Sequence, residues 1–190
     1  MLEAALDVQS EKAMVTFNLP PEVERVIREF WTCELSTLAR DGTPITWPVL
    51  PIYRPGQRQF VILATIGLPQ KTINIRRNPR VSLLFSEPLG SGLSSPPAVL
   101  VQGNAEAPDV IHTRWASIDN ELREDLLAQT RRVIKDQPAP SAYVSNPVVR
   151  YLFDWYFMRL MITITPCRIL WWDHGDFGPA PHEIKVTHVE

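Results

Sequence analysis

The chain has 190 residues, of which 45% are hydrophobic and 21% are charged, a composition ordinary for a soluble protein with a sizeable core. Its formal net charge of -2 leaves no basic footprint for nucleic acid, so we expect no nucleic-acid partner. The longest apolar segment, residues 148–164, is interrupted by charged residues, and the N-terminus lacks the pattern of a secretory signal. We therefore expect no membrane span and a cytoplasmic location.

Residues 1–19 are expected to be a loosely ordered lead-in. The stretch "PPEVERVIREFW" then predicts a short amphipathic helix, because Val23, Val26, Ile27 and Phe30 recur at helical spacing. Pro20-Pro21 sets the start of this helix, since proline suits a first helical turn.

Residues 33–65 predict three successive antiparallel strands. The stretch "CELSTLAR" alternates like a half-buried strand, "DGTP" and "RPGQ" are turn signals, and "QFVILAT" reads as a buried strand. Between the two turns, "ITWPVLPIY" is extended. Its prolines, Pro48 and Pro51, cannot donate ladder hydrogen bonds, so this strand should lie at an edge or contain bulges.

A short helix is predicted from Gln70 to Arg77, after Pro69 and before Asn78-Pro79, although alternating isoleucines there would also suit a strand. Lys71 lies in the first turn, where the helix macrodipole disfavours positive charge. A phosphate bound by the free N–H groups, Lys71 and the Thr65 hydroxyl would remove that conflict. The alternative is that Lys71 points into water.

The rest of the chain predicts more strands and two helices. "PRVSLLF" and "AVLVQGNAEA" read as strands, the latter with a candidate bulge at Gly103. A helix is expected over 108–138, with Pro108 and Asp109 in its first turn, and a buried helix over 148–161. "ITITPCRILWWD" reads as two strand pieces broken at Pro166, and the tail after it shows little pattern. These elements indicate a β-barrel with a helical insertion.

The two cysteines and four histidines predict neither a disulfide framework nor a metal site. Cys33 and Cys167 are expected to be reduced core residues. The histidines are dispersed, and none stands at metal-ligand spacing with a cysteine or carboxylate. Of the consecutive pair Trp171-Trp172, one ring should face the core and the other should face outward if the segment is extended.

The order "LSTLARDGTP…WPVLPIY…QFVILAT…LPQKTINIRRNPRVSLLF…VLVQGNAEA" resembles the pyridoxamine 5'-phosphate oxidase-like superfamily of FMN-binding split β-barrels. The resemblance covers about residues 22–106, and its most specific piece is the lysine followed by Asn-Pro-Arg-Val. It implies a mainly β fold with helices (α+β), an antiparallel split β-barrel over residues 20–190 with a helical insertion at 107–160. It also implies a homodimer with a cofactor at the interface and a small-molecule substrate.

The resemblance further implies which residues hold the cofactor, with FMN as the first choice and coenzyme F-420 as the alternative. The phosphate would be held at the start of the short helix, and the ring would be lined by two strands and by the C-terminal strand. The residues implied are Thr65, Gln70, Lys71 and Thr72 for the phosphate, and Trp47, Pro48, Val49, Ala64 and Trp172 for the ring.

This chain departs from the founding enzymes of the superfamily in having Trp47 and Ile52 where they carry basic residues, and Gln70 where an arginine often stands. The pocket is therefore less basic, which makes F-420 a serious alternative. No protein acid or base is evident, so the cofactor would carry a hydride transfer. The competing hypothesis is a non-catalytic dimeric module that binds flavin or haem, in which His112 or His174 would be the axial ligand.

Overall fold

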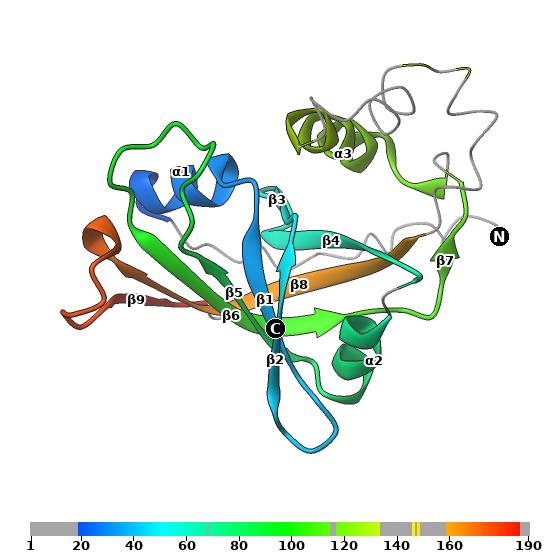
Figure 1. Cartoon of the computed structure of the whole chain (residues 1–190), viewed down its shortest axis with the longest axis horizontal. Helices are drawn as coiled ribbons and strands as arrows, with labels where there is room; N and C mark the ends of the chain where they lie inside the picture. The colour runs from blue at the N-terminus through cyan, green and yellow to red at the C-terminus, as the bar shows by residue number, and fades with distance from the viewer. Residues whose placement is uncertain are drawn as a thin grey trace, which may run out of the picture.

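The computed structural model describes residues 19–67, 69–114, 117–133, 146, 148 and 159–186. Three α-helices, one short 3-10 helix and nine strands make up the described part of the chain (Figure 1). In chain order these are α1 (Pro21–Glu29), β1 (Cys33–Leu38), β2 (Pro44–Val49), β3 (Ile52–Arg54), β4 (Gln59–Thr65), α2 (Gln70–Arg77), β5 (Arg80–Phe85), β6 (Ala98–Glu106), β7 (Ile111–His112), α3 (Asn120–Val133), β8 (Arg159–Trp172), η3 (Asp173–Gly175) and β9 (His182–Lys185).

All strand pairs are antiparallel, and the main strand order is β2-β1-β5-β6-β8-β4-β3. The two ends of this order, β2 and β3, are joined by Leu50 and Pro51 alone. Val49 and Ile52 are three residues apart and so lie within about 10 Å of each other, which requires the sheet to curl until its end strands meet. The result is a split β-barrel, with a seam where β2 and β3 turn from one sheet edge to the other. This confirms the predicted fold class.

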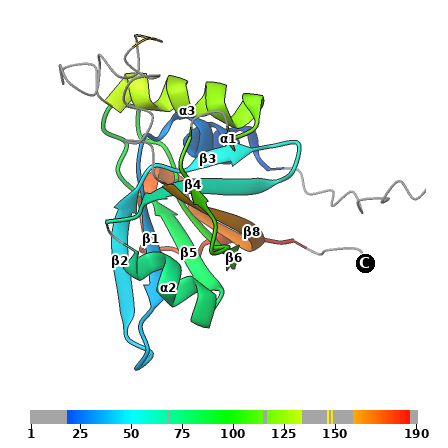
Figure 2. The same ribbon diagram turned by 90° about the vertical axis from the view of Figure 1, so that its right-hand side faces the viewer.

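Alternating residues of the strands fill the barrel and form one core cluster. Its largest fully buried members include Phe60 and Phe85, whose ring centroids lie 6.0 Å apart. Helix α1 adds Val23, Val26 and Ile27 to this core, and α2 adds Ile75. The two helices lie at opposite ends of the barrel (Figures 1 and 2). The predicted helix at "PPEVERVIREFW" is confirmed.

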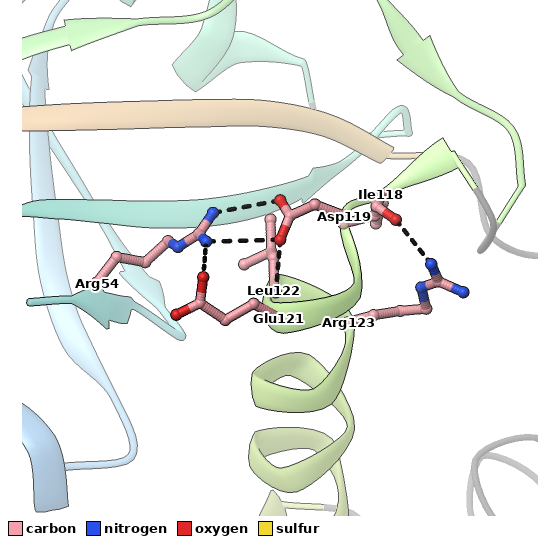
Figure 3. A network of polar contacts seen from close by, with 6 residues as sticks. All are labelled: Arg54, Ile118, Asp119, Glu121, Leu122 and Arg123. Atoms are coloured by element: carbon pink, nitrogen blue, oxygen red, sulfur yellow. Dashed lines mark hydrogen bonds and ion pairs between the residues drawn. The ribbon is translucent and has the colours of Figure 1, made fainter. Parts of the chain in front are cut away.

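Helix α3 packs over β3 and β4 through a second, small core of Ile52, Val61, Ile118 and Leu122. Arg54 of β3 fixes the start of α3 by pairing with two of its carboxylates, Asp119 at 3.2 Å and Glu121 (Figure 3).

The predicted helix over 108–138 is wrong at its beginning. Ile111–His112 forms a strand on β8, and α3 begins only at Asn120. The physical reason is the cap: Asp119 Oδ1 accepts the backbone N–H of Leu122 at 2.9 Å, which makes Asp119 the residue that starts the helix. Residues 134–145 lie outside the described part of the chain.

Three further predictions are corrected by the strands. The stretch "ITWPVLPIY" is two strands, β2 and β3, because Pro51 interrupts the ladder. Of the helix predicted over 148–161, residues 159–161 are instead the start of β8, and 149–158 lie outside the described residues. The featureless tail contains β9, which pairs with β8.

Strand β8 is continuous through Pro166 rather than broken there. The pairing with β6 shifts from Gln102↔Arg168 to Gly103↔Pro166, so Cys167 is an extra residue on β8, and the irregularity predicted at Gly103 is confirmed. Cys33 is buried as expected, whereas Cys167 is exposed, because the bulge displaces it from the core face. Among the described residues, no helix is long and apolar enough to cross a membrane.

Candidate functional site

Helix α2 has the predicted bounds, Gln70 to Arg77, and follows β4 after a turn of four residues. Pro69 stands at its N-cap, and the Thr72 hydroxyl donates to the Pro69 carbonyl at 2.6 Å. Thr72 is fully buried. Its hydroxyl therefore shapes the turn that precedes the helix.

The far half of α2 is tied to the barrel by polar contacts that fix its orientation. Asn74, with no exposed surface, donates to Thr37 Oγ1 at 3.0 Å, and Arg77 donates to the Leu38 carbonyl at 2.7 Å. Arg76 donates to the Ala107 carbonyl at 2.6 Å and also pairs with Asp109. Both arginines have structural partners, in agreement with their position late in the helix.

Lys71 is buried in the first turn of α2 without a counter-ion. Only 8% of the residue is exposed. Within the described residues it has no ion pair and no side-chain hydrogen bond, and its one recorded contact places Nζ 5.5 Å from the ring centroid of Trp47. Burial lowers the pKa of its ammonium group from the usual lysine value. A largely buried lysine without an ion pair, whose ammonium still reaches the surface at a helix N-terminus, is an arrangement that an anion would complete.

Trp47 reaches this cation from the other side of the seam. It lies on the edge strand β2, opposite Leu35 of β1, and packs against the barrel core. Lys71 belongs to the helix that follows β4, close to the other end of the strand order. The contact therefore bridges two edges of the sheet that are distant along the hydrogen-bonded order.

The other predicted phosphate residues lie near Lys71 along the chain. Thr65 is the exposed last residue of β4, so its hydroxyl is accessible at the start of the turn to α2. Gln70 is exposed too, and its Nε2 donates to Asn74 Oδ1 at 3.0 Å. Asn74 was not identified from the sequence as part of this site. Its only signal in the sequence was a polar residue next to Ile75, which is buried on the same short helix.

The predicted ring residues are divided between surface and core. Pro48 is exposed, with its missing N–H tolerated on an edge strand, whereas Val49 and Ala64 are buried at 7% and 3% exposure. The side chain of Ile52 belongs to the second core under α3 rather than to this site.

Trp172 is not brought to Lys71 within one chain. It pairs with Ala98 at one end of β8, while Thr65 pairs with Arg159 at the other end. The 14 residues of β8 span roughly 40 Å. Trp171 faces the core and the Trp172 ring lies 5.1 Å from that of Phe177, so the two tryptophans face opposite sides as predicted.

The described residues offer no cluster of histidine, cysteine and carboxylate groups that could hold a metal ion. His112 contacts Ser117, His174 contacts Ser95, and His182 pairs with Asp173 at 3.0 Å; His188 lies outside the described residues. A surface depression of about 400 Å³ on the outer face of the sheet is lined by Ser36, Ser82 and Gln102 among others, and not by Lys71.

Comparisons with solved structures agree with this fold. A protein related to general stress protein 26, of the pyridoxinephosphate oxidase family, from Clostridium acetobutylicum aligns with a TM-score of 0.54 and 11% identity, covering 86% of this chain and 92% of that one. An F-420 reductase aligns at 0.52 and 18%, covering 80% and 98%. A heme binding protein from Mycobacterium smegmatis aligns at 0.51 and 17%, covering 89% and 60%.

At these identities the structural likeness establishes the fold alone. A comparison with curated proteins found no matching sequence. The family model described as Pyridoxamine 5'-phosphate oxidase, however, matches residues 19–161, which is well over half of the chain. The split barrel, the short helix with its lysine and this match together place the chain in the pyridoxamine 5'-phosphate oxidase-like family.

Proposed function

We propose that this protein is an oxidoreductase that binds a phosphate-bearing flavin-type cofactor at the N-terminus of α2 and transfers hydride or electrons to or from a small organic substrate. The observation that carries the proposal is Lys71, a buried cation without a counter-ion in the first turn of a helix. A phosphate ester supplies the missing charge and accepts hydrogen bonds from the free N–H groups of that turn.

In this proposal the chain's own residues bind and orient. Lys71 holds the phosphate, and Thr65 and Gln70, both exposed beside it, offer a hydroxyl and a carboxamide. Pro48 and the Trp47 ring present an apolar surface on the free edge of β2. Thr72 drops out of the set of phosphate ligands because its hydroxyl is used by Pro69. The cofactor would supply the redox chemistry, and the protein would orient it and exclude water.

FMN is the first choice of cofactor, and coenzyme F-420 is the alternative. FMN carries a phosphate monoester with up to two negative charges, whereas F-420 carries a phosphodiester with one. Among the described residues of α2 itself, Lys71 is the cation without a hydrogen bond or ion pair, since Arg76 and Arg77 bind backbone carbonyls. One unpaired cation on α2 matches the lower charge well, which is the specific reason for keeping F-420 as the second candidate.

The absorption spectrum of freshly purified protein and titrations with FMN and F-420 test the proposal directly. Replacing Lys71 (Lys71→Met) should weaken binding of the preferred cofactor by about 1.5–3 kcal/mol, roughly 10- to 150-fold in Kd, because a charge-assisted hydrogen bond is lost. Lys185→Met is the matched control, since this exposed lysine on β9 lies far along the fold from α2 and should not affect Kd.

Wild-type protein that is colourless and binds neither cofactor in calorimetry would refute the proposed function. If binding occurs but Lys71→Met leaves Kd unchanged, the cofactor lies elsewhere. Turnover separates an enzyme from a binding module: bound cofactor that a nicotinamide donor reduces, and that a substrate reoxidises, identifies the enzyme.

A further inference from the structure

The contact between Trp47 and Lys71 takes the place of the ion pair that a buried lysine ordinarily needs. The Lys71 ammonium lies over the indole ring, 5.5 Å from its centroid, with 8% of the residue exposed. The negative face of an indole attracts a cation without cancelling its charge. A carboxylate in the same place would also stabilise the ammonium, but an incoming anion would have to displace it.

None of the charged groups described below, on α2 and on the strands packed against it, serves as a counter-ion for Lys71. Arg76 and Arg77 bind backbone carbonyls. Glu34 of β1 accepts from Ser86 at the far end of its strand, and Glu106 at the end of β6 is exposed. None of these groups contributes to the lowered pKa of Lys71, whose cause is burial alone.

The Trp47 ring is held by packing rather than by a hydrogen bond. Its Nε1 is buried and finds no acceptor in the described part of the chain. An unpaired buried N–H is unfavourable, so a hydrogen bond does not explain the position of the indole. What the ring does contact is the barrel core on one side and the Lys71 ammonium over its face.

We propose that Trp47 is the positioning residue of the anion site: its indole face keeps the Lys71 ammonium charged and in place while leaving it free of any counter-ion. A phosphate then binds without displacing a protein carboxylate. The effect on cofactor affinity rests on the proposed function, whereas the pairing itself is a property of the chain without ligand.

A series of tryptophans with increasing numbers of ring fluorines at position 47 tests the pairing, because fluorine weakens the negative ring face while nearly preserving the size of the ring. The pKa of Lys71, followed by NMR of labelled lysine side chains and assigned by the loss of its signal in Lys71→Met, should fall stepwise along the series. The Kd for FMN should rise about 3- to 10-fold across it, because the weakened ring face holds the ammonium less well.

Two further substitutions and one control distinguish positioning of the Lys71 ammonium by Trp47 from a contribution of Trp47 to packing alone. Trp47→Phe keeps a ring face and removes the unpaired N–H, so it should retain most of the affinity. Trp47→Leu removes the ring face and should show the full loss of affinity. The same fluorine series at Trp31, a half-buried residue beside Gly90, should change neither the pKa of Lys71 nor the Kd.

A pKa of Lys71 that stays constant along the fluorine series overturns the inference, as does a Trp47→Phe variant that behaves like Trp47→Leu. A stepwise fall in that pKa in a protein that binds neither FMN nor F-420 supports the Trp47–Lys71 pairing and refutes the cofactor assignment. The two failures are therefore distinguishable.

Discussion

For Lys71, the position in the helix could be predicted from the sequence, but the burial of its side chain could not. Its place in the first turn of a helix was predictable, because Pro69 and Asn78-Pro79 delimit that helix in the sequence. Its burial was not, because burial depends on Trp47, a residue 24 positions earlier on a strand at the opposite end of the sheet order. Local sequence patterns hold no signal for such a contact.

The buried cation should make the stability of the cofactor-free protein depend on pH. Burial lowers the pKa of Lys71 in the folded chain, so between that pKa and the unfolded value of about 10.4 the unfolded chain binds more protons, and stability rises with pH. At pH values below the folded-state pKa, Lys71 is charged in both states, and the whole cost of burying its charge lowers the free energy of unfolding. Lys71→Met should therefore raise the Tm at pH 7, and its advantage should shrink as pH approaches 10.

Thermal unfolding of wild type and Lys71→Met across pH 6 to 10, without cofactor, measures this difference. Lys185→Met, which removes an exposed lysine, should show no pH-dependent difference from wild type. A Lys71→Met protein that is less stable than wild type at pH 7 would mean that the contact with the Trp47 ring outweighs the cost of burying the ammonium.

At the scale of elements, the pairing of β6 with β8 depends on the absence of a side chain at Gly103. A Cβ built there would lie 2.3 Å from the carbonyl oxygen of Thr165 and 3.0 Å from the Cα of Pro166. Both are backbone atoms of the partner strand, so a side chain cannot be accommodated by rotation of a neighbour. The glycine permits the close approach that the Cys167 bulge creates.

Gly103→Ala should lower the free energy of unfolding by at least about 1–3 kcal/mol, because the two central strands must separate to admit a methyl group. Urea unfolding followed by fluorescence measures the change. Gly56→Ala is the control, since a Cβ there meets no atom within 4 Å. Equal midpoints for the two variants would contradict the steric assignment.

The strands and short helices were largely predictable, while several boundaries were not. Alternation and turn residues located β1, β4, β5 and β6, and Pro69 and Asn78 located α2. The start of α3 was misplaced because Pro108 and Asp109 resemble a first turn, whereas the true cap, Asp119, is selected by its bond to the Leu122 N–H and by Arg54. The sequence predicted a break in β8 at Pro166. The strand continues there because a bulge accommodates the proline, and that bulge requires Gly103 on the neighbouring strand, which a local pattern does not reveal.

At the scale of the whole molecule, Trp172 and Lys71 of one chain lie too far apart to contact the same cofactor. The two residues are associated with opposite ends of β8, roughly 40 Å apart along that strand. If Trp172 covers a cofactor held by Lys71, it must be the Trp172 of a second copy. We therefore expect a homodimer, with a mass in solution twice the 21.7 kDa of the chain, and two sites that each combine residues of both copies.

Mixed dimers test this arrangement. Combining a Lys71→Met chain with a Trp172→Leu chain should leave one intact site per mixed dimer, whereas combining a chain that carries both substitutions with wild type should leave none. Calorimetric stoichiometry and affinity for the cofactor distinguish these cases. A monomeric mass, or equal binding by both mixtures, would contradict a site shared between copies.

The strand order also has a consequence for how a growing polypeptide completes this architecture. Hairpins β1–β2 and β3–β4 are local, yet β8, which lies between β6 and β4 in the sheet, is synthesised after both of its neighbours. Until β8 pairs with them, β6 and β4 each have an edge of unpaired backbone N–H and C=O groups that can pair with another polypeptide. We therefore expect the nascent protein to be vulnerable to aggregation until β8 has left the ribosome and paired with β6 and β4.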